Sequence, residues 1–179
     1  MTTEEMVALI RDGVPVRGGV WADFGAGTGN FTQALQACLG DDAVLYAVDR
    51  DERALRQLRR RWTGPNTLHT LTADFTQPLT GLPALEGALM ANALHFTPFT
   101  VQSAVLAQVV SYLKPGTPLI VVEYDVRQRR SYIPHPVSYG RFEDLARAIG
   151  LQDPRRIGLR RSPRTGQSMY AACALRPSG

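Results

Sequence analysis

The feature that most constrains the fold is a short apolar run that leads directly into three alternating glycines. It spans residues 20–31 and reads VWADFGAGTGNF. Because glycine lacks a Cβ and tolerates positive φ, this pattern predicts a buried strand that breaks into a tight turn and then opens a helix. Unpaired backbone N–H groups at such a helix start favour negative charge, and nucleotide cofactors are held at turns of this kind.

Two classes of nucleotide cofactor compete for this turn. The dinucleotide fingerprint G-x-G-x-x-G needs a third glycine at position 30, where the chain has Asn30. An acid stands two residues before the first glycine, giving Asp23-x-Gly25-x-Gly27-x-Gly29. This string resembles motif I of the class I S-adenosylmethionine (SAM)-dependent methyltransferases. An NAD-binding protein is the less favoured alternative.

Two further acids follow expected strands. An apolar run ends in Asp49, 20 residues after Gly29, where an acid can accept hydrogen bonds from ribose hydroxyls. Asp49 could instead cap the next helix, but Asp51 is available for that. The string Leu71-Thr72-Ala73-Asp74-Phe75 resembles the family's third-strand motif, in which an acid receives the adenine amino group and an apolar neighbour covers the ring. The alternative for Asp74 is an acid on a surface loop.

The fourth expected strand ends in Asn92-Ala93-Leu94-His95-Phe96. This string resembles the family's motif IV, at the sheet edge where open α/β folds place their reaction site. Members that methylate nucleic-acid amino groups usually have prolines after the Asn or Asp, and none follows here. The resemblance therefore favours a small or medium-sized acceptor, methylated at O, N or C. An RNA or protein methyltransferase, or a SAM-binding module without transferase activity, stays open as the alternative.

The resemblance implies SAM as the cofactor, with S-adenosylhomocysteine as its product. The residues expected to bind it are Asp23, Gly25, Ala26, Gly27, Thr28, Gly29, Asn30, Phe31, Asp49, Arg50, Asp74, Phe75, Asn92 and Ala93.

Candidate catalytic residues follow from the chemistry of methyl transfer. Because the methyl group of SAM is already activated, alignment of the acceptor does most of the work. A base is needed only where the acceptor must lose a proton. His95 is a candidate base because histidine titrates near neutrality; alternatively it packs against adenine or makes a structural hydrogen bond. Glu123, at the end of the fifth expected strand, either orients the acceptor or pairs with an arginine.

A loop rich in proline and aromatic residues, 131–139, is expected on the same rim. Its prolines fix φ and stiffen it, so we expect a substrate wall, although it could simply pack over the sheet edge. The expected acceptor contacts are Tyr124, Tyr132 and His135, with Arg127 placed to bind a carboxylate or phosphate.

Charge is unevenly distributed along the chain. Residues 1–125 carry a net charge of −4, and residues 126–179 carry +8. A basic half suits an acidic substrate or nucleic acid, but nineteen of the twenty basic residues are arginine, which is typical of a composition bias. Nucleic acid is therefore an open but not a favoured partner.

The remaining sequence features point to a cytoplasmic protein without a membrane or metal partner. The chain has no run of 18 apolar residues, and its N-terminus is unlike a signal peptide. Its two cysteines, Cys38 and Cys173, fit neither a disulfide framework nor a metal site.

The alternation of apolar runs and helical patterns predicts one α/β domain over 1–179, with a Rossmann-like doubly wound sheet and helices on both faces. Strands are expected at 20–24, 44–48, 68–72, 87–91, 118–124, 156–161 and 168–175, and helices at 4–11, 31–39, 52–62, 99–113 and 138–149. A turn at 163–167 makes the last two strands a hairpin, so a mostly parallel seven-stranded sheet should end with an antiparallel strand. The resemblance places strand seven between strands five and six.

Two finer expectations concern the third long helix and the site entrance. In the helix at 99–113, Val101, Val105 and Val109 are expected to face inward. Only about 18 residues precede the first strand, too few for the sizeable lid of many relatives. We therefore expect an open site, or one closed by a second subunit in a homodimer.

Overall fold

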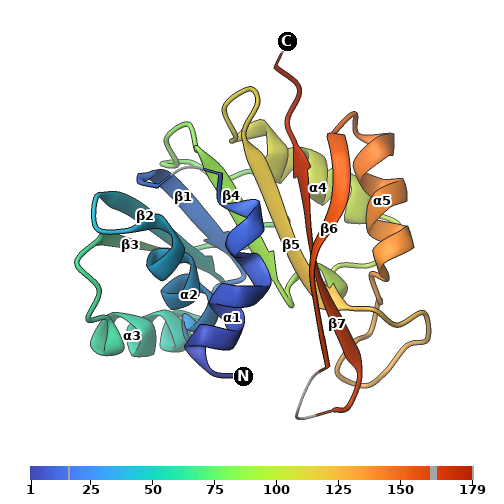
Figure 1. Ribbon diagram of the computed structural model, residues 1–179, viewed down its shortest axis with the longest axis horizontal. Helices are drawn as coiled ribbons and strands as arrows, with labels where there is room; N and C mark the ends of the chain where they lie inside the picture. The colour runs from blue at the N-terminus through green and yellow to red at the C-terminus, as the bar shows by residue number, and fades with distance from the viewer. Residues whose placement is uncertain (16, 162–164, 179) are drawn as a thin grey trace.

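One seven-stranded sheet organises the chain. The computed structural model describes residues 1–15, 17–161 and 165–178. The strands are β1 (Gly19–Phe24), β2 (Ala43–Asp49), β3 (Thr67–Thr72), β4 (Gly87–Ala91), β5 (Pro118–Tyr124), β6 (Gln152–Arg161) and β7 (Ser168–Leu175). Their order is β3-β2-β1-β4-β5-β7-β6, with β1–β5 parallel and β7 antiparallel to both of its neighbours (Figure 1). The expected fold class and the place of strand seven are confirmed.

Helices cover both faces of this sheet. They are α1 (Thr3–Ile10), α2 (Asn30–Leu39), α3 (Glu52–Arg61), α4 (Gln102–Ser111) and α5 (Tyr139–Ala148), with short 3₁₀ turns η1 (Arg11–Gly13) and η2 (Leu94–Phe96). Apolar residues of α1 and α2 pack with Trp21 of β1 on one face. Those of α4 and α5 pack with Ala22 and Phe24 on the other (Figure 1). Successive residues of β1 thus serve opposite cores, as the pleat of a strand requires.

Strand β6 begins four residues before the expected start. The added segment contains Asp153, in left-handed backbone with φ 48°, followed by Pro154. Register shifts interrupt the pairing with β7 between Gln152 and Arg155 and again between Arg156 and Gly158. Proline is tolerated in strands at sheet edges and bulges, and β6 is an edge strand, so the Asp153-Pro154 segment fits into the irregular start of this strand.

Helix α4 begins three residues after the expected start, which corrects the expectation for Val101. The preceding residues form a turn in which the N–H of Val101 donates to the carbonyl of Pro98 at 3.0 Å. Val101 is 42% exposed, whereas Val105 and Val109 are buried as expected. The buried residue at the helix start is instead polar, Gln102.

The expected hairpin turn at 163–167 lies partly outside the described residues, because the structure describes it only from Thr165. Within the described ranges, no helix is long and apolar enough to cross a bilayer.

Candidate active site

Three clefts lie at the carboxyl ends of the parallel strands, and Asn92 lines all three. The first cleft, of about 370 Å³, is lined by Gly25, Gly27, Asp49, Arg50, Ala73, Asp74, Phe75, Thr76, Asn92, Ala93, Phe96 and Thr97. The second, of about 320 Å³, is lined by Met1, Met6, Asp23, Gly25, Ala26, Gly27, Thr28, Asn30, Phe31, Ala91 and Asn92. The third, of about 380 Å³, is lined by Asn92, His95, Phe96, Tyr124, Tyr132 and Thr165. All the expected cofactor residues except Gly29 line the first or second cleft.

Gly27 and Gly29 have different surroundings in the glycine turn between β1 and α2. Gly27 has φ 53°, and a Cβ built on it would meet no described heavy atom within 4 Å, so its backbone borders the open clefts. Gly29 has φ 84°, and a Cβ there would lie 2.1 Å from Cδ1 of buried Leu58. Gly29 lines neither of the first two clefts, and its missing Cβ leaves room for Leu58 of α3.

Asp49 supports the same turn from β2. One carboxylate oxygen accepts from the N–H of Gly27 at 2.8 Å, and the other accepts from the N–H of Asp51 at 2.8 Å. Asp51 caps α3, accepting from Arg53 at 2.9 Å and from Ala54 at 3.2 Å. Asp51 is thus the residue that caps α3, as expected, and Asp49 lines the first cleft.

Asp23 carries a buried carboxylate whose two oxygens differ in their hydrogen bonding. Its Oδ2 accepts from the hydroxyl of Thr32 at 2.7 Å, whereas its buried Oδ1 has no partner among the described residues. Burial raises the pKa of Asp23 to about 7; the Thr32 hydrogen bond opposes this rise, and the nearby charge of Asp49 adds to it. A charge this deep needs a donor, and the second cleft, which Asp23 lines, is where one can reach it.

Asn92 presents a second buried oxygen without a partner in the described chain. Its backbone is left-handed, with φ 52°, and its N–H donates to the carbonyl of Val122 at 2.8 Å. Asparagine is among the residues that best tolerate this conformation. Such backbone is costly elsewhere and concentrates at functional sites, which fits the place of Asn92 where the three clefts meet.

The first cleft is also lined by residues of the loop after β3 and of η2. Oδ1 of Asp74 accepts from the backbone N–H and the hydroxyl of Thr76, at 2.9 and 2.7 Å. The amide of Gln108 donates to the carbonyl of Phe75 at 2.9 Å and so fixes this loop to α4. Phe96, 57% exposed, lines both the first and the third cleft.

The buried side chains of His95 and Glu123 form a pair. Nδ1 of His95 lies 2.6 Å from Oε2 of Glu123, and the backbone N–H of His95 donates to Oε1 at 3.1 Å. Both residues are buried. A carboxylate accepts from Nδ1–H, so the pairing leaves Nε2 as the nitrogen with a free lone pair. Glu123 therefore pairs with a histidine rather than with an arginine, and it does not line the third cleft as His95 does.

The loop after β5 supplies only part of the expected substrate wall. Reciprocal backbone hydrogen bonds of 3.0 Å between Arg130 and Ile133 make a tight turn that carries Tyr132. The rings of Tyr132 and Tyr124 meet edge to face with centroids 6.0 Å apart, and both line the third cleft. Arg127 is exposed and lines none of the three clefts.

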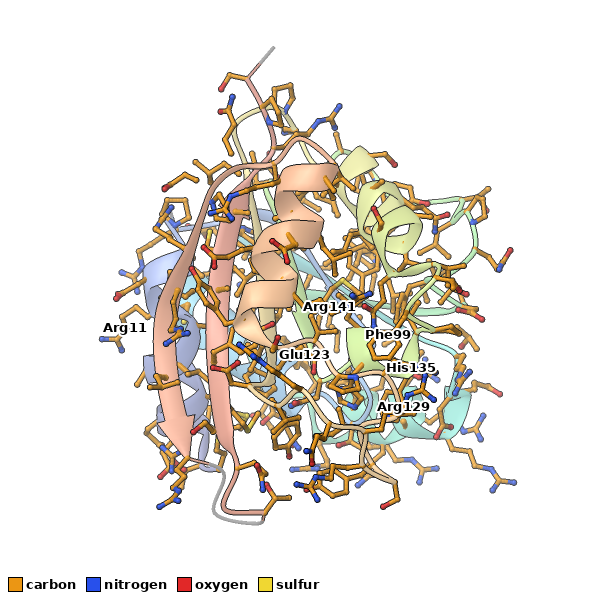
Figure 2. All side chains as sticks on the ribbon, turned by 90° about the vertical axis from the view of Figure 1, so that its right-hand side faces the viewer. Arg11, Phe99, Glu123, Arg129, His135 and Arg141 are labelled. Carbon is orange, nitrogen blue, oxygen red and sulfur yellow. The ribbon has the colours of Figure 1, made fainter. Side chains whose placement is uncertain are left out.

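His135 also lies outside the three clefts, in a polar network centred on Gln102. Its N–H donates to the carbonyl of His95 at 3.0 Å, and its ring meets that of Phe99 edge to face at 5.2 Å. Figure 2 shows His135 and Phe99 side by side, with Arg129 near them. The buried amide of Gln102 donates to the carbonyls of Thr97 and His135 at 3.1 and 3.0 Å. His135 therefore joins η2 to the loop, and it lines none of the three clefts.

Sequence reasoning missed several lining residues, chiefly Met1, Met6, Thr76, Phe96, Thr97 and Thr165. Met6 was indistinguishable from an ordinary core residue of an amphipathic helix. Among these residues only Phe96 belonged to a recognised motif, because it ends the string Asn92-Ala93-Leu94-His95-Phe96 after β4. No group of three or more His, Cys, Asp or Glu suited to a metal occurs among the described residues.

The strand order and the position of the clefts define a class of protein. A seven-stranded sheet in this order, with a glycine turn after β1 and an antiparallel strand beside β5, is the Rossmann-like fold of class I SAM-dependent methyltransferases. Residues 22–116 match the family described as "Methyltransferase domain". The chain belongs to this family, and SAM is its cofactor.

Solved methyltransferases share this fold. The 1,6-didemethyltoxoflavin-N1-methyltransferase of Burkholderia thailandensis is 19% identical, with a TM-score of 0.74 over 98% of this chain and 78% of that one. The magnesium protoporphyrin IX methyltransferase of Synechocystis PCC 6803 is 21% identical, with a TM-score of 0.71 over 98% and 78%. An arsenic(III) methyltransferase of Chlamydomonas reinhardtii is 16% identical (TM-score 0.72); 92% of this chain covers 65% of that protein. No curated protein matches the chain in sequence.

Proposed function

We propose that residues 1–179 act as one domain that transfers the methyl group of SAM to oxygen, nitrogen or carbon of a small or medium-sized molecule. SAM supplies an activated methyl group, so the protein has to bind it, align the acceptor and exclude competing water. The observation that carries the proposal is the second cleft, where Asp23 and Asn92 each hold a buried oxygen without a described partner beside the open backbone of Gly27.

The second cleft suits the amino-acid end of SAM. An ammonium group supplies the donors that Oδ1 of Asp23 and Oδ1 of Asn92 lack, and a charged donor offsets the cost of a buried carboxylate. The N-terminus of the ten-residue helix α2, beginning at Asn30, borders the same cleft. Its unpaired N–H groups suit the carboxylate of SAM.

The first cleft suits the adenosine end. Asp49 is held at its edge by two backbone N–H groups and can accept from ribose hydroxyls with its remaining lone pairs. Asp74 uses Oδ1 to hold Thr76, which leaves Oδ2 for the adenine amino group. Phe75 lines the same cleft as the apolar cover for the base.

The third cleft suits a small acceptor better than a polyanion. Its volume, about 380 Å³, lies in the range of small-molecule sites. Several arginines of the basic C-terminal part are engaged within the protein: Arg155 pairs with Asp153 at 2.5 Å, and the Arg141 side chain donates to Gln102 at 2.7 Å. Arg141 is therefore not displayed for phosphate contacts, whereas Arg155 stays partly exposed beside Asp153.

We expect Asp49→Ala to weaken SAM binding about 10- to 100-fold, because charged hydrogen bonds of this kind contribute about 1.5–3 kcal/mol each. The matched control is Asp51→Ala, which removes the cap of α3 but lines neither cofactor cleft. It should lower the melting temperature and leave the SAM affinity unchanged. Calorimetric titration measures both. Unchanged affinity in Asp49→Ala would remove Asp49 from the proposed ribose site.

The proposed reaction is tested by incubating the protein with methyl-labelled SAM and fractionated cell extract. We expect the label to appear in the small-molecule fraction together with S-adenosylhomocysteine. Label confined to RNA or protein would favour a macromolecular acceptor. Binding of SAM without transfer to any fraction would contradict enzyme activity and favour a SAM-binding module.

A further inference from the structure

The third cleft is lined mainly by aromatic side chains. Phe96 and Tyr132 are large side chains that remain 57% and 42% exposed, and both turn a face to this cleft together with Tyr124. No residue that lines it among the described parts of the chain is Asp, Glu, Lys or Arg. Aromatic walls bind flat, uncharged molecules by stacking and by edge-to-face contact. The lining therefore selects a planar acceptor whose bound part carries no charge.

The geometry around His95 adds a proton acceptor to this aromatic cleft. His95 lines the cleft, and Oε2 of Glu123 lies 2.6 Å from its Nδ1 as the acceptor of a hydrogen bond. The backbone of His95 is held on both sides: its N–H donates to Glu123, and its carbonyl accepts from His135 at 3.0 Å. The ring is thus fixed in one orientation, with Nε2 as its free base. When Nε2 takes a proton, the resulting imidazolium faces the Glu123 carboxylate, which stabilises it.

The third cleft meets both cofactor clefts at one residue. Asn92 lines all three, three positions before His95 in the chain. An acceptor in the third cleft therefore lies next to the place where the amino-acid and adenosine ends of SAM join. The base, the acceptor and the methyl group come together at this point.

We infer that the acceptor is a planar aromatic molecule with a weakly acidic hydroxyl, that His95 removes the hydroxyl proton, and that Glu123 is the positioning residue for His95. This inference rests on the proposed function. The acceptor oxygen bonds to the methyl carbon as the carbon–sulfur bond breaks, and the hydroxyl proton passes to Nε2. The sulfonium becomes a neutral thioether, and the proton later leaves to solvent. A neutral amine would not need this base, because its lone pair is already free.

The test uses a panel of hydroxylated bicyclic aromatics, such as naphthols and hydroxyquinolines, with matched amino compounds. We expect transfer from SAM to the hydroxyl compounds to depend on His95, and transfer to the amino compounds not to depend on it. His95→Gln should lower kcat about 100- to 1,000-fold with KM changed less than about 3-fold, since general bases contribute about 10²–10⁴. Tyr132→Ala should leave kcat nearly unchanged and raise KM about 10-fold. His69→Gln is the control, because His69 stacks on Tyr46 away from the clefts.

Acceptor acidity separates a base from a structural histidine. A polyfluorinated naphthol that is already ionised at the assay pH should restore most of the lost rate in His95→Gln. Glu123→Gln should lower kcat and move the pH dependence of kcat/KM, with melting checked by circular dichroism. Equal losses on ionised and un-ionised acceptors, or an equal loss of turnover on the hydroxyl and the amino compounds in His95→Gln, would overturn the inference. Both results leave SAM binding and methyl transfer intact, whereas failure to bind SAM would instead overturn the proposed function.

Discussion

Asp23→Asn should weaken SAM binding about 10- to 100-fold and yet stabilise the free protein above pH 7. The ionised carboxylate is the proposed partner of the SAM ammonium group, and replacing it with an amide removes a charge-assisted hydrogen bond. Such bonds contribute about 1.5–3 kcal/mol, so we expect the dissociation constant to rise about 10- to 100-fold. Asp51→Asn, at the cap of α3, is the matched control and should leave affinity unchanged.

The stability effect follows from the raised pKa of Asp23, about 7 in the folded protein. An unfolded aspartate titrates near 3.9, so the folded state holds the proton more tightly. The stability that this proton contributes is fully present below about pH 4 and is lost as the pH rises through about 7. The buried charge then costs up to about 4 kcal/mol, which asparagine avoids. Denaturation at pH 8 should show Asp23→Asn as the more stable protein, and the difference should shrink at pH 4.5.

The same titration predicts proton release when SAM binds. At pH 6 most of Asp23 is neutral, and pairing with an ammonium group requires its ionisation. Calorimetry in two buffers with different ionisation enthalpies should therefore detect a released proton at pH 6 in the wild type and none in Asp23→Asn. Equal heats in both buffers for the wild type, or wild-type affinity in the variant, would remove Asp23 from the proposed site.

Gly27→Ala and Gly29→Ala should have different effects although the two glycines lie in one turn. The first should mainly weaken SAM binding, and the second should mainly lower stability. A Cβ on Gly29 would lie 2.1 Å from Leu58, so alanine adds overpacking to left-handed strain. We expect a loss of about 3 kcal/mol, or roughly 6–12 °C in Tm for a chain of this size. A Cβ on Gly27 projects into open cleft, so its cost is the strain alone, about 1–2 kcal/mol, but SAM affinity should fall more than about 100-fold because the backbone approach is blocked.

A double variant isolates the packing role of Gly29. In a Leu58→Ala background the clash partner is gone, so Gly29→Ala should cost only the strain of the left-handed backbone. Denaturant unfolding of the four proteins of this cycle measures the coupling. An unchanged cost of Gly29→Ala in that background would show that the packing of α2 against α3 does not require the glycine.

Much of the proposed cofactor site was predictable because its residues are tied to local backbone. The glycine turn needs Gly27 for close approach, and Asp23 and Asp49 stand at fixed offsets from strand ends, so residue type and spacing carry their positions. The distinction between Gly27 and Gly29 was not predictable, because it depends on Leu58 from another helix.

The acceptor side was less predictable because its contacts join distant parts of the chain. Glu123 and His95 are 28 residues apart, and only the pairing of β4 with β5 brings them together. Gln102 is a polar residue in an expected helix, yet it is buried and ties two loops together. Nothing in the local sequence distinguishes a polar side chain of this kind from a solvated one.

Calorimetric titration of the protein with SAM, S-adenosylhomocysteine and NAD tests the central claim most directly. The two clefts around Gly27 predict micromolar binding of SAM and S-adenosylhomocysteine and no binding of NAD. Binding of NAD without the other two would contradict the assignment of the glycine turn and of both cofactor clefts.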